Sequence, residues 1–393
     1  MNIASVSWGD HLSFGEGDGR LGTPDAVRRR LDRWQAELVV DTLHWRVLRS
    51  RIPGRYAAAP GHVHPSADTA SRLAWTEFDV VPALAHDAGL RAELYVSIFD
   101  EGWPLAPPEV RAVSHHNAMH GRDVAWQSDF SLAHPHLAEV DRSGTCRQWG
   151  VLTLAEAEVR AQFVDRISAW LRASAFDGVF VCLRSQSKPA AHADEFGYGP
   201  ATRCAVLEAT GHDILGDRFD VQAWRDIRGG FLTEFLRELR GATRALGRTV
   251  SVGAPRGDVL GPPLGNLTLD WRTWMRERLV DALVIDQNSS RCPSMWHDLW
   301  PMHRGVGYLQ NYLTGEGLPS IETQVRDSYG PQAMATGTAL YLARQWSPRD
   351  AALEAHLRTL PGVTGLVFST FRHDNAGAVR RGDWTYRAPG GHD

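Results

Sequence analysis

The stretch FDGVFVCLRSQS, from Phe176 to Ser187, is the clearest strand signal in this chain and decides its fold. Its first half is an apolar, β-branched run introduced by Asp-Gly, which predicts a buried strand. Its second half is polar and leads into DEFGYG at residues 194–199, which predicts a loop. A buried strand that opens into a polar loop is typical of the parallel sheets of α/β enzymes.

The same pattern recurs along the chain, because short β-branched runs alternate with longer amphipathic segments. The expected strands are Ile3–Trp8, Leu38–Trp45, Arg91–Phe99, Asp177–Arg184, Thr249–Ala254, Asp281–Asn288, Val306–Leu313 and Thr364–Phe371. The segment 331–346, PQAMATGTALYLARQW, is expected to be a helix. Eight strands with no G-x-G-x-x-G after the first favour a closed (β/α)8 TIM barrel over a doubly wound nucleotide-binding fold. We therefore expect one barrel domain, 1–393, with a long inserted loop at about 102–149 after the third strand.

The composition argues against several kinds of partner. The formal net charge is −4, from 42 basic and 46 acidic residues, and the basic residues form no block. Nucleic acids and anionic membranes both bind to clustered positive charge, so we expect neither as a partner. The cysteines show no CxxC spacing, which favours free thiols over a disulfide or zinc framework; they are Cys146, Cys182, Cys204 and Cys292. The start, MNIASVSWGD, lacks the features of a signal peptide, so we expect a cytoplasmic protein, or a secreted one whose signal peptide has been removed.

The run from His134 to Arg184 resembles a known group of barrels. It reads HPHLAEVDRSGTCRQWGVLTLAEAEVRAQFVDRISAWLRASAFDGVFVCLR and continues into FGYG. It is similar to bacterial glycoside-hydrolase-like barrels related to family 10, which have an HPEW…D.DG passage, then P.VR, a helix, and a DGI/V strand at the fourth barrel position. The resemblance implies a (β/α)8 carbohydrate-active enzyme that acts on an oligo- or polysaccharide. Such relatives commonly carry an aspartate near the end of this strand, where this chain has Cys182 or Ser185.

A glycoside hydrolase normally needs two carboxylates, one to protonate the leaving oxygen and one to act as nucleophile or base. Barrel enzymes take such groups from the C-terminal ends of strands and the loops after them. Glu195 is the first choice for the acid, because the aromatic residues after it predict partial burial and a raised pKa; Asp194 is the alternative. For the second carboxylate we expect Glu322, in SIETQ after the seventh expected strand, with Asp286 at the end of the sixth as its rival.

Other polar and aromatic residues at the expected strand ends predict sugar contacts, because hydroxyls pair with polar side chains and sugar rings stack on aromatic faces. The candidates are Trp8, Asp41, His44, Trp45, Tyr95, Arg184, Gln310 and Asn311. Arg184, at the tip of the fourth strand, would either hold a neighbouring acid ionised or bind an anionic sugar such as a uronate. Cys182 is expected to be a buried structural thiol.

Two other functions fit the sequence. A metal-dependent hydrolase or lyase would use a His-rich loop, formed by His115, His116, His120, His134 and His136 with Asp123 or Asp129. A carbohydrate-binding barrel without catalysis would explain the missing aspartate on the fourth strand. For the hydrolase we expect a carbohydrate substrate and no metal or other cofactor.

Overall fold

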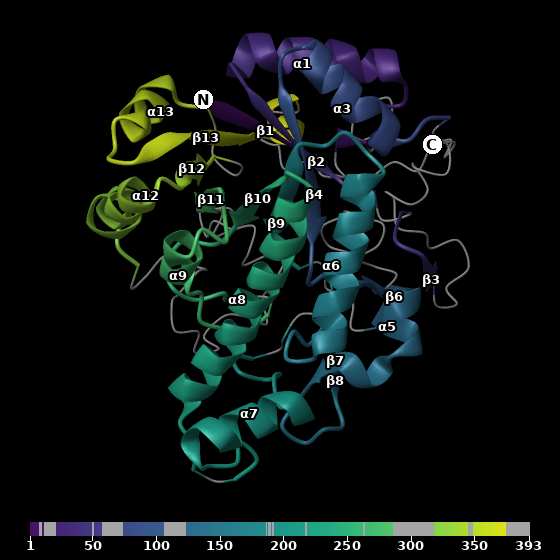
Figure 1. Ribbon diagram of the computed structural model, residues 1–393, viewed down its shortest axis with the longest axis vertical. Coiled ribbons are helices and arrows are strands. Elements are labelled where there is room, and N and C mark those ends of the chain that lie inside the picture. The colour runs from purple at the N-terminus through teal and green to yellow at the C-terminus, as the bar shows by residue number, and fades with distance from the viewer. Residues whose placement is uncertain are drawn as a thin grey trace, which may run out of the picture.

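The computed structural model describes residues 1–7, 10–11, 21–48, 51–56, 74–105, 123–185, 187, 190, 192–216, 218–261, 264–285, 318–344 and 349–374. Eight parallel strands close into a barrel in the order β1-β13-β12-β11-β10-β9-β4-β2 (Figure 1). They are β1 (Asn2–Val6), β2 (Thr42–Arg46), β4 (Arg91–Ser97), β9 (Gly178–Cys182), β10 (Thr249–Gly253), β11 (Ala282–Ile285), β12 (Ala339–Ala343) and β13 (Val363–Ser369). The chain is a (β/α)8 barrel, as its sequence predicts.

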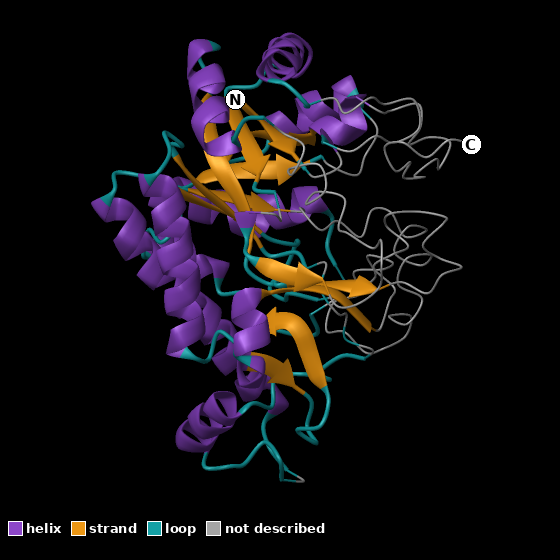
Figure 2. Ribbon diagram, turned by 90° about the vertical axis from the view of Figure 1, so that its right-hand side faces the viewer, coloured by secondary structure: helices purple, strands orange, loops and turns teal. Residues whose placement is uncertain are grey.

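Helices cover the outside of the barrel (Figure 2). The main ones are α1 (Pro24–Leu38), α3 (Glu77–Asp87), α6 (Ala157–Arg172), α8 (Val221–Ala245), α9 (Trp271–Arg276), α12 (Gly330–Thr336) and α13 (Ala351–Arg358). Shorter helical turns are α11 (Ile321–Gln324), the π-helical η6 (Val325–Tyr329) and α14 (Thr370–Asp374). In α1, the Thr23 side chain accepts a hydrogen bond from the Ala26 amide and Pro24 occupies the first turn, an arrangement that favours a helix start at these residues.

The seventh barrel strand differs from the prediction. It is β12, which lies inside the segment 331–346 that we expected to be a helix. The helix α12 ends because Gly337 adopts a left-handed φ of 73°, with its N–H bonded to the Ala333 carbonyl, and the chain then extends. The short apolar run after this glycine suits either a helix or a strand, and pairing with β11 and β13 selects the strand. The strand expected at Val306–Leu313 lies outside the described residues.

The insertion after the third barrel strand has a structure of its own. Its strands β5 (Gly102–Leu105) and β6 (Asp123–Ser128) join β3 (Gly54–Tyr56) in an antiparallel sheet. After α5 (Asp129–Ala133) and a 3-10 turn, η4 (Pro135–Leu137), β7 (Ala138–Val140) pairs with β8 (Arg147–Leu152). These elements and α7 (Pro200–Thr210) lie beyond the C-terminal ends of β4 and β9, away from the chain's N-terminus (Figure 1). The insertion therefore builds up one side of the barrel end that carries active sites in this fold.

Candidate active site

A group of polar side chains lies where β2, β4 and β9 end. Arg46 of β2 pairs in register with Tyr95 of β4, and Ser97 of β4 pairs with Cys182 of β9. Because alternate residues of a barrel strand face the interior, Tyr95 and Ser97 share the inner face of β4. We call Arg46, Tyr95, Ser97, Asp100, Cys182 and Arg184 the mouth cluster. Its members Arg46, Tyr95, Asp100 and Cys182 are buried, whereas Arg184 is partly exposed.

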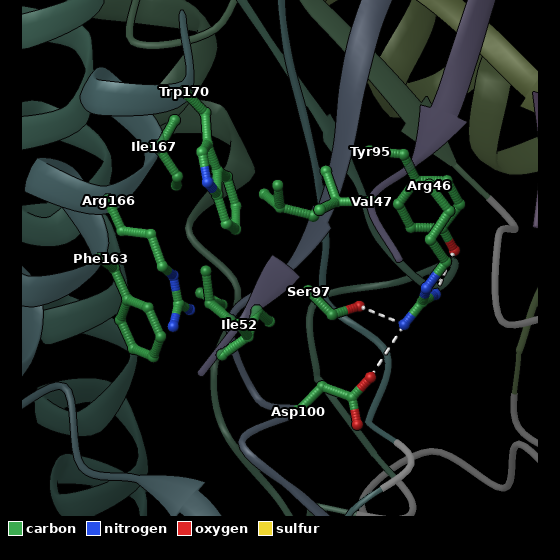
Figure 3. A pocket seen from close by; sticks show the side chains of 12 residues that line it. Arg46, Val47, Ile52, Tyr95, Ser97, Asp100, Phe163, Arg166, Ile167 and Trp170 are labelled. Atoms are coloured by element: carbon green, nitrogen blue, oxygen red, sulfur yellow. Dashed lines mark hydrogen bonds and ion pairs between the residues drawn. The ribbon is translucent and has the colours of Figure 1, made fainter. Parts of the chain in front are cut away.

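The Tyr95 hydroxyl is the centre of this cluster. It accepts hydrogen bonds from Nη1 of Arg46 at 2.9 Å and Nη2 of Arg184 at 2.8 Å, and it donates to Sγ of Cys182 at 3.3 Å. Arg46 also donates to Ser97 Oγ at 3.1 Å and to Asp100 Oδ2 at 2.9 Å (Figure 3). Three adjacent strands are thereby tied together at one point, and two guanidinium groups converge on one hydroxyl.

The positive charges of the cluster dominate the local field. Burial alone raises the pKa of the Cys182 thiol, but the charges of Arg184 and Arg46, with hydrogen bonds from Tyr95 and the Arg184 amide, bring that pKa below its usual value. For Tyr95, burial has the larger effect and its pKa is raised, although both arginines oppose this. The pKa of Arg184 is raised by Tyr95 and Cys182, against the effect of its own burial. Of the Tyr95 hydroxyl and the Cys182 thiol, the thiol is the one whose anionic form is favoured.

A small cavity of about 20 Å³ lies between the outer side of β4 and Phe163, Ile167 and Trp170 of α6. Arg46 and Tyr95 point away from these side chains (Figure 3), because Tyr95 belongs to the barrel interior, whereas Phe163 and Ile167 pack between the barrel and its helices. The Arg166 guanidinium stacks on the rings of Phe163 and Trp170, at 5.1 and 5.5 Å from their centroids. Arg166 also binds both carboxylate oxygens of the buried Glu101, at 3.2 and 2.6 Å. A cavity of this size holds about one water molecule and belongs to the packing between the barrel and α6.

A second buried carboxyl lies just after β1. Asp10 accepts hydrogen bonds from the Ser7 amide at 2.7 Å and the Ser7 hydroxyl at 3.0 Å, and its other oxygen lies 2.6 Å from the Thr370 hydroxyl. Burial raises the pKa of Asp10 from 3.8 to about 7, more strongly than these bonds lower it. The adjacent His11 is buried with its ring edge-on to Trp45, and burial lowers its pKa to about 3. Asp10 therefore exchanges its proton near neutral pH.

Of the predicted sugar contacts, Arg184 and Tyr95 meet directly in the mouth cluster. His44 lies deeper in the barrel, stacked on Phe180 at 4.0 Å and 3.3 Å from Glu93. Asp41 precedes β2 and accepts a hydrogen bond from the Asn2 amide, so it lies at the opposite end of the strand. Trp45 is fully buried beside His11. Trp8, Gln310 and Asn311 lie outside the described residues.

The loop with the predicted acid docks on α8 and β7. Asp194, in a left-handed conformation with a φ of 61°, forms an ion pair with Arg225 of α8. The next residues are held as firmly, because Trp224 Nε1 donates to the Gly197 carbonyl at 2.9 Å and the Gly197 amide donates to the Val140 carbonyl at 3.0 Å. Glu195 is half-buried in this loop. The DEFGYG stretch is thus a docking motif between the insertion and α8.

The second predicted carboxylate has a different place in the chain. Glu322 lies in α11, which precedes the seventh barrel strand instead of following it, because that strand is β12. Its Oε1 is 3.9 Å from Nε2 of His356 in α13, in the helical layer. Its rival Asp286 immediately follows β11 and lies outside the described residues. The structure thus brings Glu322 together with α13.

Sequence reasoning missed Arg46 as part of the site. Strand alternation carries the signal, because Arg46 is two residues beyond His44 and so shares its face of β2. Asp100 directly follows the third expected strand, Arg91–Phe99. The ion pair between these two residues joins β2 to the loop after β4.

The His-rich loop of the metal-site alternative is described at His134 and His136. His134 has its Nε2 3.5 Å from Glu158, while His115, His116 and His120 lie outside the described residues. In the described ranges, no group of three or more His, Cys, Asp and Glu side chains could hold a metal ion. The described cysteines Cys146, Cys182 and Cys204 form no disulfide with one another, and Cys292 is not described. Across the described helices, none is long and apolar enough to span a bilayer.

Comparison with known proteins places the fold. No protein-family model and no curated protein matches the chain. Its structure is similar to the glycoside hydrolase domain of PgaB (BpsB) from Bordetella bronchiseptica, with a TM-score of 0.50 and 12% identity, covering 98% of this chain and 99% of that one. It is also similar to the β-galactosidase of the psychrophilic Marinomonas ef1, with a TM-score of 0.50 and 11% identity, covering 94% of this chain and 54% of that one.

At such identities the likeness shows the fold alone. The chain spans about half the length of the galactosidase, and nearly all of the PgaB domain. The class that the structure defines is therefore a (β/α)8 barrel, the fold that the chain shares with these two solved structures. The likeness does not single out family 10.

Proposed function

We propose that the chain is a glycoside hydrolase that binds an oligo- or polysaccharide at the C-terminal end of its barrel and cleaves a glycosidic bond there. The observation that carries this proposal is the mouth cluster, which brings hydrogen-bonding groups from three adjacent strand ends to one point. Sugar hydroxyls are recognised by such polar groups. Barrel enzymes build their active sites at this end of the strands.

The catalytic pair is proposed among the four predicted carboxylates. We assign the acid role to Glu195, because it is half-buried in a loop fixed to α8. Asp286 is favoured as its partner, because it directly follows β11, whose residues Ala282 and Val284 belong to the barrel interior. Asp194, bound to Arg225, and Glu322, beside His356, are the substitutes.

The test is an assay of hydrolysis on a panel of aryl glycosides and oligosaccharides, in which the new reducing ends are measured. Glu195→Gln and Asp286→Asn are each expected to lower kcat by about 100-fold or more, since general acid–base groups contribute roughly 10²–10⁴-fold. Glu277→Gln is the control, because Glu277 forms an exposed ion pair with Arg237. Full activity in both test variants contradicts the assigned pair. Sugar binding without turnover of any substrate contradicts hydrolysis and supports a binding barrel.

A further inference from the structure

Two arginines from strands on either side of β4 meet at the floor of the barrel mouth. We propose that the mouth cluster recognises a carboxylate, so that the carbohydrate bound here is acidic, such as an oligosaccharide containing a uronic acid. This inference rests on the proposed function, because it names the substrate class of the same site.

The geometry gives the two arginines different roles. Arg46 is only 4% exposed and is fixed by Asp100, Ser97 and Tyr95. Arg184 is partly exposed and approaches the same Tyr95 oxygen from β9. Arg184 is therefore the arginine that reaches a ligand, and Arg46 is the positioning residue behind it. A guanidinium has a planar set of N–H donors that matches the two oxygens of a carboxylate.

The charge of the cluster favours an anion. Among the described residues, the ionisable groups that face one another are Arg46 on β2, Tyr95 on β4, Cys182 and Arg184 on and after β9, and Asp100 after β4. Two guanidinium charges thus lie within hydrogen-bond distance of one oxygen, beside the single negative charge of Asp100. A carboxylate held here gains electrostatic stabilisation that a neutral sugar does not, and burial reduces its screening by salt.

A sugar phosphate shares part of this chemistry but fits the cluster less well. The Arg184 guanidinium has a planar set of donors, which matches a carboxylate of single charge. A phosphate monoester carries nearly two charges and three terminal oxygens, and it takes more donors. The proposal therefore commits to a carboxylate, and a phosphate is an outcome of the test.

The test measures binding by calorimetry, without relying on turnover. The ligands are glucuronate and galacturonate, as monosaccharides and short oligosaccharides, against glucose, galactose and their phosphates. Wild-type protein is expected to bind a uronate at least about tenfold more tightly than the matching neutral sugar. Arg184→Met is expected to abolish that preference, and Arg184→Lys to retain part of it because the charge stays while the planar donor set is lost. Arg237→Met, which changes an exposed arginine paired with Glu277, is expected to keep the full preference.

The outcomes separate this inference from the proposed hydrolase activity. Uronate binding that depends on Arg184, without any hydrolysis, keeps the substrate class and rejects the activity. Equal affinity for uronate and neutral sugars in wild-type protein overturns the inference, even if neutral oligosaccharides are hydrolysed. Tighter Arg184-dependent binding of a sugar phosphate also overturns it. Should Arg184→Met fail to fold, the wild-type comparison and Arg184→Lys still decide.

Discussion

The guanidinium of Arg228 lies directly against the α-carbon of Gly197, so that a methyl group added to this glycine would come within 2.4 Å of Nε. Gly197 also has a φ of 118°, which residues with a side chain rarely adopt. Arg228 is fixed from behind, because its Nη1 donates to the Asn266 carbonyl at 3.1 Å and it stacks on Trp224 at 4.9 Å. Gly197 thus permits the DEFGYG loop to dock on α8.

Gly197→Ala is therefore expected to destabilise the protein by about 2 kcal/mol or more, through backbone strain and displacement of a buried arginine. Urea unfolding measures the change. The control is Gly241→Ala in the interior of α8, where a Cβ meets nothing within 4 Å. This control is expected to be neutral or to stabilise by about 0.5–1 kcal/mol, because alanine favours helix. A Gly197→Ala protein as stable as wild type would show that the loop moves freely.

Arg166→Ala is expected to cost about 3–5 kcal/mol, because it removes the bidentate partner of Glu101, whose side chain is 1% exposed. Arg237→Ala, which breaks the exposed pair with Glu277, is expected to cost less than about 1 kcal/mol. Denaturant unfolding of both variants at neutral pH and moderate salt gives the comparison. Similar losses in the two variants would mean that burial does not set the strength of the Arg166–Glu101 pair.

The barrel could be read from the sequence because each βα unit carries its own local signal. Strand runs such as Asp177–Arg184 and a capped helix start at Thr23 are set by nearby residues. The seventh strand was missed because β12 is a five-residue apolar run next to a helix, and only its two neighbouring strands select the extended form. Local patterns lack that information.

The candidate site was less predictable, because it depends on which strand ends meet. Arg184 and Tyr95 could each be picked out, but their contact, and the part of Arg46 in it, follow from the order β2-β4-β9. Docking of Asp194 on Arg225 requires that α8 extends past the barrel, which its own sequence does not specify. Residue types were therefore visible from the sequence, and their partners came from the closed barrel.

Asp10 is expected to make stability fall as pH rises from about 4 to about 7. Its pKa is 3.8 as a free side chain and about 7 in the fold, so in this range the native state holds a proton that the unfolded state has released. A protonated Asp10 can donate to Thr370 while the Thr370 hydroxyl donates to the Ser5 carbonyl, whose oxygen is 3.1 Å away. In the Asp10→Asn variant, the asparagine side chain offers an N–H that can donate to Thr370 in the same way.

This variant is therefore expected to lose that part of the pH dependence and to gain stability relative to wild type above pH about 7. Urea unfolding of both proteins from pH 4.5 to 8 isolates the effect, because other titrating groups cancel in the difference. A difference that stays constant over this range would contradict a raised pKa for Asp10.

Tyr95→Phe is expected to destabilise the protein by about 1–3 kcal/mol, because two arginines lose an acceptor and the Cys182 sulfur loses a donor at a buried site. Uronate affinity should fall as well, since the Tyr95 hydroxyl holds the Arg184 guanidinium in place. Calorimetry and urea unfolding on one preparation measure both quantities. Tyr341→Phe is the matched control within the barrel interior, where Tyr341 belongs to the same apolar cluster as Tyr95. It is expected to leave uronate affinity unchanged, and an equal loss of affinity in both variants would show that the hydrogen bonds of the Tyr95 hydroxyl do not specifically organise the mouth cluster.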